Sequence, residues 1–434
     1  MSASRLRAPF ASERGPEARL MGSTALGQLL ALAVAPLLGR LLGPEAFGSF
    51  GIYLAVLGTV GGAASWRLGL AVPVPRDDDA ALDVVAAGLS ATAVSGAVAL
   101  GLVWALGSPL AGTLGAPDAA PLLWWIPISI VGVGVTDVLS GWCLRYREFP
   151  ALVHQRVVRA VGTSVWQLLH ALLIRASAIP LVIGEALGRL ASILAMAGII
   201  WRREQARFRA ITAARIAGAL GAQRAFVLVA TPSHLVNMLG QWIPVFLLTY
   251  WWGAAAAGLY VVGQRVIGIP IGLIGDSAGQ VYLADLAARS RNAPAEMPAL
   301  FREVALRLAK LAAVIAIVLI ALGPIGFSLG FGSVWTDAGR MVRWQGLALA
   351  AQMVAIPMAH TLVVLRFQRR QLLWDVFRLV FTSGGFALAR RLGADAVSAV
   401  AIHGGVTALL YSTLVWLSWQ AVVRRGSDDP GAAT

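Results

Sequence analysis

Long apolar runs alternate with short polar and basic segments along almost the whole chain. Runs such as LLALAVAPLLGRLLG, AAVIAIVLIALG and VTALLYSTLVWLSW approach the roughly 20 residues that a membrane-spanning helix needs. The pattern predicts an all-α polytopic membrane protein with about twelve transmembrane helices. The predicted spans are 20–42, 47–70, 81–105, 121–143, 150–173, 178–201, 226–250, 254–284, 304–327, 341–365, 371–389 and 396–421.

The arginines between the spans predict how the chain is oriented. With the N-terminus inside the cell, 21 arginines lie in cytoplasmic segments and 6 lie on the opposite side. Short loops that are rich in arginine and lysine stay in the cytoplasm. We therefore expect both termini to be cytoplasmic.

The longest connection between spans is strongly basic and divides the chain near its middle. It predicts an N-terminal six-helix lobe at 1–205, a basic cytoplasmic linker at 206–225 and a C-terminal six-helix lobe at 226–434. Because each lobe has an even number of spans, the two lobes would be parallel repeats.

A short motif recurs at equivalent places in the two predicted lobes. It joins spans 1 and 2 in the first lobe and spans 7 and 8 in the second, 210 residues later. The position of the motif supports the repeat more than its composition does, because glycine and alanine are common throughout the chain. The two copies are Gly43-x-x-Ala46-x-Gly48-x-Phe50 and Gly253-x-x-Ala256-x-Gly258-x-Tyr260.

Composition agrees with a membrane protein and argues against several other classes. Hydrophobic residues make up 58% of the chain and charged residues 13%, about half the charged fraction of a soluble protein. The net charge of +14 sits in short loops and at span ends, so we expect no nucleic acid partner. Cys143 is the single cysteine, which excludes a disulfide framework and a cysteine metal cluster. The loops are too short to house a catalytic site, so the chain is predicted not to be an enzyme.

Span 5 carries a polar stripe, formed by Arg156, Arg159, Thr163, Gln167 and His170 at helical spacing. Two arginines facing lipid would be costly, so the stripe can be interpreted as one wall of an aqueous cavity. Alternatively, both long side chains reach the cytoplasmic interface. The polar residues beyond the arginines favour the cavity.

Spans 6 and 8 contain further charged residues. Glu185 and Arg189 stand one turn apart in span 6. They form either a self-neutralising pair or a site where Glu185 restrains cavity arginines or binds a coupling ion. Arg265 and Asp276 share one face of span 8, with Pro270 between them. Because proline lets a spanning helix bend, Pro270 is either a hinge or a static kink.

Single polar residues in other spans have two interpretations as well. On span 7, Asn237 and Gln241 share a face that suits hydrogen bonds to sugar hydroxyls or to a neighbouring helix. For isolated groups in apolar runs, a satisfied packing role is favoured over ion binding. These groups are Asp137, His234, His360 and His403.

Two segments resemble a known family. Residues 37–81, LLGRLLGPEAFGSFGIYLAVLGTVGGAASWRLGLAVPVPRDDDAA, contain an R-x-L-G-P-E-x-F-G turn. Residues 243–287, IPVFLLTYWWGAAAAGLYVVGQRVIGIPIGLIGDSAGQVYLADLA, contain a G-x-Y-x-x-x-x-R-x-x-x-x-P pattern. Together these segments resemble the Wzx-type polysaccharide (O-antigen) flippases, the oligosaccharide-lipid branch of the MOP transporter superfamily. They cover about a fifth of the chain.

The resemblance implies two lobes around a central cavity, in the inner membrane of a bacterium. Such a transporter would move an undecaprenyl-pyrophosphate-linked oligosaccharide from the inner to the outer leaflet by alternating access, for polysaccharide or lipopolysaccharide biosynthesis. It implies no cofactor, coupling to a proton or sodium gradient, and contact with membrane lipids and polysaccharide-assembly proteins. Guanidinium groups match phosphate oxygens. The implied cavity arginines are Arg156, Arg159, Arg265, Arg189 and Arg67.

Three alternatives remain open. A multidrug exporter of the same superfamily would need carboxylates in its cavity for cationic drugs, whereas the charge within the spans leans positive. A membrane glycosyltransferase or polymerase that acts on lipid-linked sugars would need a larger outer loop. A scaffold in a polysaccharide-assembly complex is the third alternative.

Overall fold

The computed structural model describes residues 16–174, 177–209, 211–365 and 367–427. These residues form thirteen α-helices joined by short turns, and they contain no β-strand. The predicted all-α class is confirmed. The helices are α1 (Pro16–Val60), α2 (Asp78–Thr113), α3 (Ala120–Leu123), α4 (Ile126–Arg145), α5 (Phe149–Leu173), α6 (Ile179–Arg209), α7 (Ala213–Ala222), α8 (Thr231–Pro270), α9 (Asp276–Asn292), α10 (Met297–Phe331), α11 (Thr336–Val364), α12 (Gln368–Arg391) and α13 (Ala396–Ser427).

The lengths and surfaces of the helices fit a membrane. Eight of the described helices are long and apolar enough to cross a bilayer: α1, α2, α4, α6, α8, α10, α12 and α13. On α10, the side chains of Val314, Ile317 and Leu329 are 60%, 64% and 74% exposed. A soluble monomer rarely exposes an apolar surface of this kind. The chain is therefore a multi-pass membrane protein.

α1 and α8 each run through parts of two predicted spans. Each is broken by one glycine, Gly43 in α1 (φ 76°, ψ 170°) and Gly253 in α8 (φ 86°, ψ 170°). Glycine adopts this positive φ without steric cost because it has no Cβ. The two copies of the sequence motif therefore produce the same backbone break.

The two breaks also pack against each other. A Cβ atom on Gly48 would collide with the backbone carbonyl of Ala254, and one on Gly258 would collide with the carbonyl of Pro44. Residues 44 and 254 are 210 positions apart, as are residues 48 and 258. The contact is therefore reciprocal, and it brings α1 and α8 into close backbone approach.

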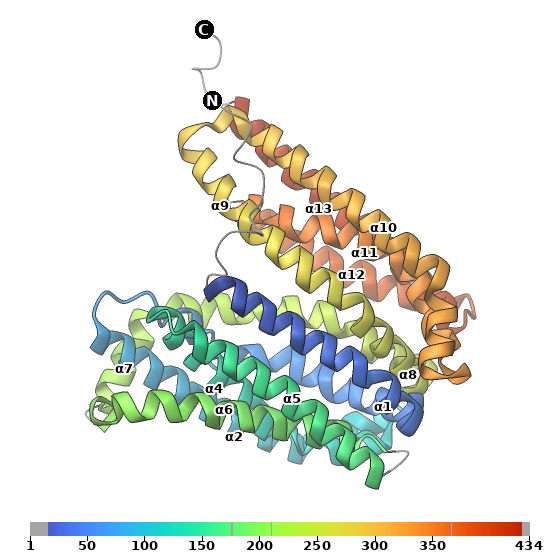
Figure 1. Ribbon diagram of the computed structural model, residues 1–434, viewed down its shortest axis with the longest axis horizontal. Helices are drawn as coiled ribbons and strands as arrows, with labels where there is room; N and C mark the ends of the chain where they lie inside the picture. The colour runs from blue at the N-terminus through green and yellow to red at the C-terminus, as the bar shows by residue number, and fades with distance from the viewer. Residues whose placement is uncertain (1–15, 175–176, 210, 366, 428–434) are drawn as a thin grey trace.

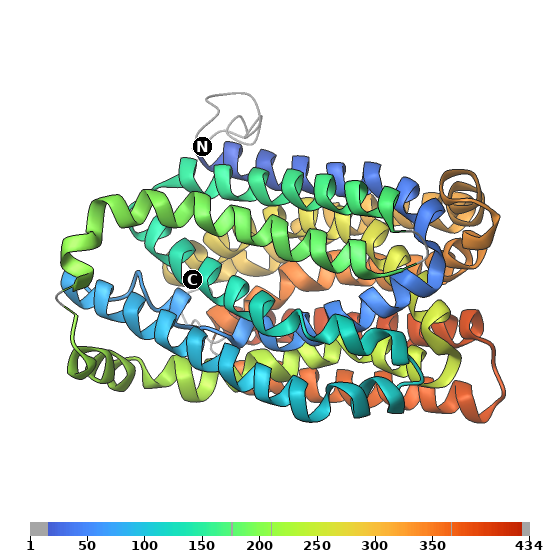
Figure 2. The same cartoon turned by 90° about the horizontal axis from the view of Figure 1, so that it is seen from below.

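The helices gather into two bundles. In Figure 1 the blue-to-green helices of the first half form one bundle, and the yellow-to-red helices α9–α13 form a second bundle inclined to it. Figure 2 shows the helices running side by side along the long axis. The bundles meet where α1, α8 and the turn between α10 and α11 come together. There the Phe47 and Trp335 rings lie 5.4 Å apart, edge to face, and the Trp335 indole donates to the carbonyl of Gly39 at 3.3 Å.

Predicted span 2 is shorter than expected. The sequence predicted a helix to residue 70, but α1 ends at Val60 and two short 3-10 turns follow, Gly61–Ala63 and Leu68–Leu70. Adjacent glycines at 61 and 62 disfavour a continued helix. Between these turns, Trp66 and Arg67 adopt left-handed backbone angles (φ 52° and 59°).

Predicted span 8 and the central linker also differ in detail from expectation. The expected helix at 254–284 is present, but it contains a π-helical turn at Ile271–Gly275, between α8, which ends at Pro270, and α9, which begins at Asp276. The segment expected as a linker at 206–225 contains the end of α6 and the whole of α7.

The beginning of α2 collects the ends of three other helices. Its acidic first turns begin at Asp77, whose side chain caps the helix by accepting from the backbone N–H of Ala80 at 3.0 Å. Each of the three acids that follow pairs with an arginine from a different helix. The pairs are Asp78 with Arg145 of α4 (2.8 Å), Asp79 with Arg207 of α6 (2.7 Å) and Asp83 with Arg215 of α7 (2.9 Å).

Candidate translocation site

An ionic cluster joins α5 and α6 inside the first half. The guanidinium groups of Arg159 and Arg189 both donate to the Oε1 atom of Glu185, at 2.9 Å and 2.5 Å. The Glu185 and Arg189 side chains are 13% and 8% exposed, whereas that of Arg159 is 40% exposed. Glu185 therefore does more than pair with Arg189 within its own helix, because it also holds an arginine of α5.

The second half of the chain contributes to the same electrostatic environment. Arg265 of α8 is half-buried and interacts electrostatically with Glu185. Arg159 and Arg189 contact Glu185 directly and Arg265 lies within electrostatic range of it, so positive charge exceeds negative charge in this group. The arginines that act on Glu185 therefore come from both halves of the chain, Arg159 and Arg189 from the first and Arg265 from the second.

Residues of α1 and α4 support the cluster. A Cβ atom on Gly132 would collide with the stem of Arg189, so this glycine gives the arginine its space. The hydroxyls of Tyr53 and Ser129 hydrogen-bond at 2.6 Å in a buried position, and Tyr53 interacts electrostatically with Glu185. Tyr53 was not among the predicted site residues, because an aromatic residue in an apolar run gives no distinguishing signal.

The polar stripe of α5 does not face one environment along its length. Arg156 is exposed and Arg159 is half-buried, which leaves both arginines at the edge of the helix packing. Thr163 and Gln167 are buried, and the Gln167 amide donates to the carbonyl of Leu181 in α6 at 2.9 Å. The expectation of a continuous cavity wall is therefore wrong for these two residues, because they pack against α6.

Two glycines in α6 make room for Thr163 and Gln167 of α5. A Cβ atom on Gly184 would collide with Gln167, and one on Gly188 would collide with Thr163. Small residues four positions apart let two membrane helices approach closely. The Gly184-x-x-x-Gly188 pattern is readable in the sequence and marks the α5–α6 interface, which fixes Glu185 opposite Arg159.

Arg67 lies in the left-handed turn after α1, where it interacts electrostatically with Asp137 of α4 and His234 of α8. Asp137 accepts a hydrogen bond from Ser65 at 2.6 Å. The His234 ring abuts the backbone of Gly62, at the contact between the first half and α8. Asp137 and His234, expected to be isolated, thus belong to one polar group with Arg67, distinct from the Glu185 cluster.

Asn237 and Gln241 belong to a third polar group, inside the second half. Asn237 donates to Asp375 of α12 at 3.0 Å, and Gln241 donates to Asn237 at 3.2 Å. Arg378 donates to the Asn237 carbonyl at 3.0 Å and to the Tyr411 hydroxyl at 3.2 Å. The sequence allowed hydrogen bonds either to sugar hydroxyls or to a neighbouring helix, and in the structure Asn237 bonds the neighbouring helix α12.

Two predicted residues cannot be placed in any of these groups. The side chains of Pro270 and Asp276 lie outside the described residues, although both positions fall at helix ends beside the π-helical turn. The described site therefore consists of Arg159, Glu185, Arg189 and Arg265, with Arg156 one turn away along α5.

Comparison with known proteins identifies a family and a fold. A family model described as "Polysaccharide biosynthesis protein" matches residues 37–340. No curated protein matches the sequence.

Three solved structures illustrate the fold. An inward-facing multidrug resistance MATE family transporter of the MOP superfamily has a TM-score of 0.72 at 14% identity, covering 94% of this chain and 98% of its own. The lipid II flippase MurJ, in an inward closed conformation, has a TM-score of 0.69 at 12% identity, with 94% and 90% coverage. An outward-facing MATE family transporter has a TM-score of 0.67 at 14% identity, with 95% and 96% coverage. The chain has the fold of these MOP-superfamily transporters.

Proposed function

Because the chain belongs to the polysaccharide biosynthesis protein family, we propose that it is a flippase for a lipid-linked oligosaccharide. In this proposal it moves an undecaprenyl-pyrophosphate-linked oligosaccharide from the inner to the outer leaflet of a bacterial inner membrane. Both termini are cytoplasmic, and the two six-helix halves move relative to each other by alternating access.

The observation that carries the proposal is the excess positive charge between the two halves. Arg159 and Arg189 come from the first half and Arg265 from the second, while Glu185 supplies one compensating carboxylate. A pyrophosphate would supply the missing negative charge, and guanidinium groups hydrogen-bond phosphate oxygens with good geometry. A head group of this kind would therefore bridge the halves.

Glu185 has a specific role in this mechanism. It holds the guanidinium groups of Arg159 and Arg189 in place while the site is empty. When a pyrophosphate binds, its oxygens compete with the carboxylate for Arg159, the more exposed of the two arginines. Substrate binding would then loosen the contact between α5 and α6. Coupling to a proton or sodium gradient is part of the proposal and is separate from this step.

The reciprocal glycine contact supports alternating access. Gly48 and Gly258 hold α1 and α8 together beside the Gly43 and Gly253 breaks. The bundles diverge away from this region (Figure 1). This arrangement fits a state that is closed on the side predicted to face away from the cytoplasm. Motion between the halves would have to separate the two glycines.

The test is polysaccharide export by the double variant Arg156→Ala/Arg159→Ala. We expect export to be lost, while the amount of protein in the membrane and its melting temperature stay close to those of the wild type. Arg307→Ala is a matched control, because Arg307 also pairs with a glutamate in a membrane helix but is 73% exposed. Normal export by the double variant would overturn the assignment of the site.

A multidrug exporter is the second candidate, because the fold also matches MATE family transporters. Carriers of cationic drugs need negative charge in the site, whereas the Glu185 cluster leaves positive charge. Resistance to cationic dyes would therefore be expected to stay unchanged when the gene is deleted, and loss of resistance would favour the exporter.

A further inference from the structure

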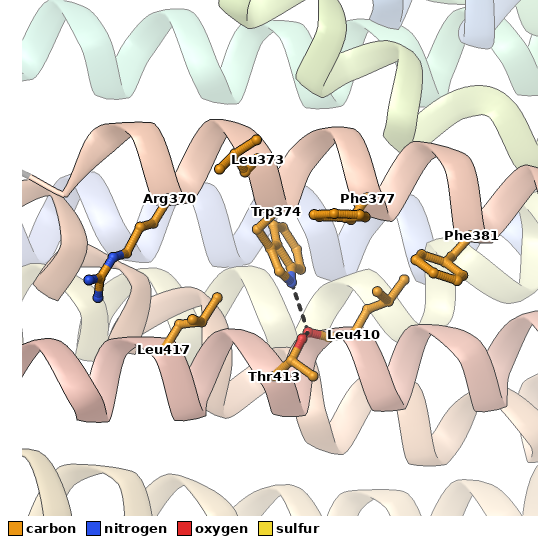
Figure 3. Close-up of a pocket in the computed structure, with 8 residues that line it drawn as sticks. All are labelled: Arg370, Leu373, Trp374, Phe377, Phe381, Leu410, Thr413 and Leu417. Carbon is orange, nitrogen blue, oxygen red and sulfur yellow. Dashed lines mark hydrogen bonds between the residues drawn. The ribbon is translucent and has the colours of Figure 1, made fainter.

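A groove runs between α12 and α13 on the surface of the protein, and its residues are far in sequence from the Glu185 cluster. Its volume is about 400 Å³. Figure 3 shows Trp374 and Phe377 of α12 between the two helices, with Arg370 at one end and Phe381 at the other. The opposite wall is formed by Leu410, Thr413 and Leu417 of α13.

The polar atoms of the groove walls are already used within the protein. The Trp374 indole N–H donates to the carbonyl of Leu410 at 2.8 Å, and the Thr413 hydroxyl donates to the same carbonyl at 2.6 Å. Between the ends, the groove therefore presents hydrocarbon and aromatic surface, while Arg370 supplies a positive charge at one end.

The floor of the groove is held rigidly. Trp374 is 5% exposed, and its ring packs edge to face against Tyr411 at 5.0 Å. The Arg378 guanidinium lies 5.3 Å from the Trp374 ring. The walls are more open, because Phe377 and Phe381 are both 53% exposed. A rigid floor with open walls favours a ligand that enters sideways from the membrane.

The length of the groove matches one leaflet. From Arg370 to Phe381 the helix rises by about 16 Å, close to half of the roughly 30 Å hydrocarbon core. Arg370 lies at the end of α12 that is predicted to be cytoplasmic, where anionic lipids give the membrane surface a negative potential. Its guanidinium stacks at 4.5 Å on Phe367, which holds it at the mouth of the groove.

We infer that the α12–α13 groove binds one anionic phospholipid of the cytoplasmic leaflet. One acyl chain lies along Trp374, Phe377 and Phe381, and the phosphate contacts Arg370. An acyl chain fills a leaflet-long groove, whereas a polyprenyl chain of 55 carbons would extend well beyond it. The site is separate from the proposed substrate site and does not depend on the flippase assignment.

The test uses the full chain, purified in detergent and freed of lipid, and native mass spectrometry to count bound lipids. Phosphatidylglycerol and phosphatidylcholine with identical acyl chains are the probes. We expect the wild type to retain phosphatidylglycerol more tightly. Arg370→Gln should weaken retention of phosphatidylglycerol by about fivefold, since one arginine near an anionic headgroup accounts for an effect of this size. Retention of phosphatidylcholine should fall less, because the choline charge already offsets the charge of its phosphate.

Two further variants separate the groove from general surface effects. Arg302→Gln is the matched control, because Arg302 stacks on Trp419 at 4.7 Å outside the groove, and it should leave retention of both lipids unchanged. Thr413→Trp should fill the groove and weaken the retention of both lipids. Leu373→Trp, at a wall residue that is 59% exposed, replaces it if Thr413→Trp lowers the melting temperature.

Equal retention of the two lipids by the wild type would overturn the proposal, as would an Arg370→Gln variant that keeps the preference. Tighter retention of a polyprenyl phosphate than of phosphatidylglycerol, sensitive to the groove-filling variant, would overturn the phospholipid as the occupant.

Discussion

Gly48 and Gly258 each face a backbone carbonyl in the other half of the chain, so that neither position has room for a side chain. The two residues are 210 positions apart and occupy equivalent places in the repeated motif. This reciprocal contact ties α1 to α8 beside their glycine breaks.

Substitution of either glycine by alanine should push the halves apart. Because the colliding atom is a backbone carbonyl, it cannot rotate away, and we expect Gly48→Ala or Gly258→Ala to cost about 1–3 kcal/mol. Spin labels at the exposed positions Asp118 and Arg391 should report a longer distance between the halves. Gly101→Ala is the control, since a Cβ there meets only open space. An unchanged distance in both variants would show that the contact does not hold the halves together.

Glu185→Gln should destabilise the first half. The substitution removes the carboxylate that holds Arg159 and Arg189 and leaves the nearly buried Arg189 without its charged partner. Loss of one member of a buried ion pair costs 3–5 kcal/mol, and we expect about 2 kcal/mol here because Arg159 is substantially exposed. Thermal unfolding in detergent measures the change. The additional substitution Arg189→Met should restore part of the loss, and failure to do so would argue against charge as the cause.

Asp375→Asn should destabilise the second half by about 3 kcal/mol, because the Arg378 side chain is 7% exposed and would lose its carboxylate partner. Asp337→Asn is the matched control. Its partner Arg340 is 59% exposed, and an exposed ion pair contributes less than about 1 kcal/mol. Equal melting temperatures for the two variants would contradict the importance of burial.

Asp395 caps α13, because its carboxylate accepts from the backbone N–H of Ser398 at 2.9 Å. The hydrogen bond from the Ser398 side chain, followed by that from its N–H, lowers the pKa of Asp395 below its usual range. A carboxyl group whose pKa is lower in the folded state stabilises the protein above its unfolded pKa and loses that effect as the pH falls through the folded pKa.

Replacing the cap should therefore have a pH-dependent effect. At neutral pH, Asp395→Ala should cost about 1 kcal/mol. The difference in unfolding temperature from the wild type should shrink as the pH falls below the ordinary aspartate range. Asp395→Asn, which can still cap the helix, should remain close to the wild type at neutral pH. A constant difference at every pH would point to a cause other than the charged cap.

The repeated elements could be predicted from sequence because their signals are local. The motif at Gly43 recurs at Gly253. Because glycine has no Cβ atom, both residues adopt the same positive φ and break their helices in the same way. The early end of α1 could not be placed in the same way. The sequence stays mostly apolar to residue 70, and the adjacent glycines at 61 and 62 are too weak a signal to place the helix end at Val60.

The site was only partly predictable from sequence. Periodicity shows which residues share one face of a helix, but it does not show which residues of another helix they contact. The spacing of Arg156 and Arg159 marks a polar face of α5, but their partner in α6 depends on the register set by Gly184 and Gly188. In the same way, the side-chain amide of Asn237 could hydrogen-bond either a sugar or the Asp375 carboxylate. Only the packing of α8 against α12 shows that it bonds Asp375.

The pairing of Asp79 with Arg207, 128 positions apart, limits how the intervening chain can enter the membrane. Two residues on one side of a bilayer must be separated by an even number of crossings. Besides the four-residue α3, the helices in this stretch are α2, α4, α5 and α6, and all of these but α5 are apolar enough to cross alone. We therefore predict that α5 supplies the fourth crossing despite its arginines. Its polar face meets glycines and Glu185 of α6, so we expect α5 to enter the membrane together with α6 as one helical hairpin.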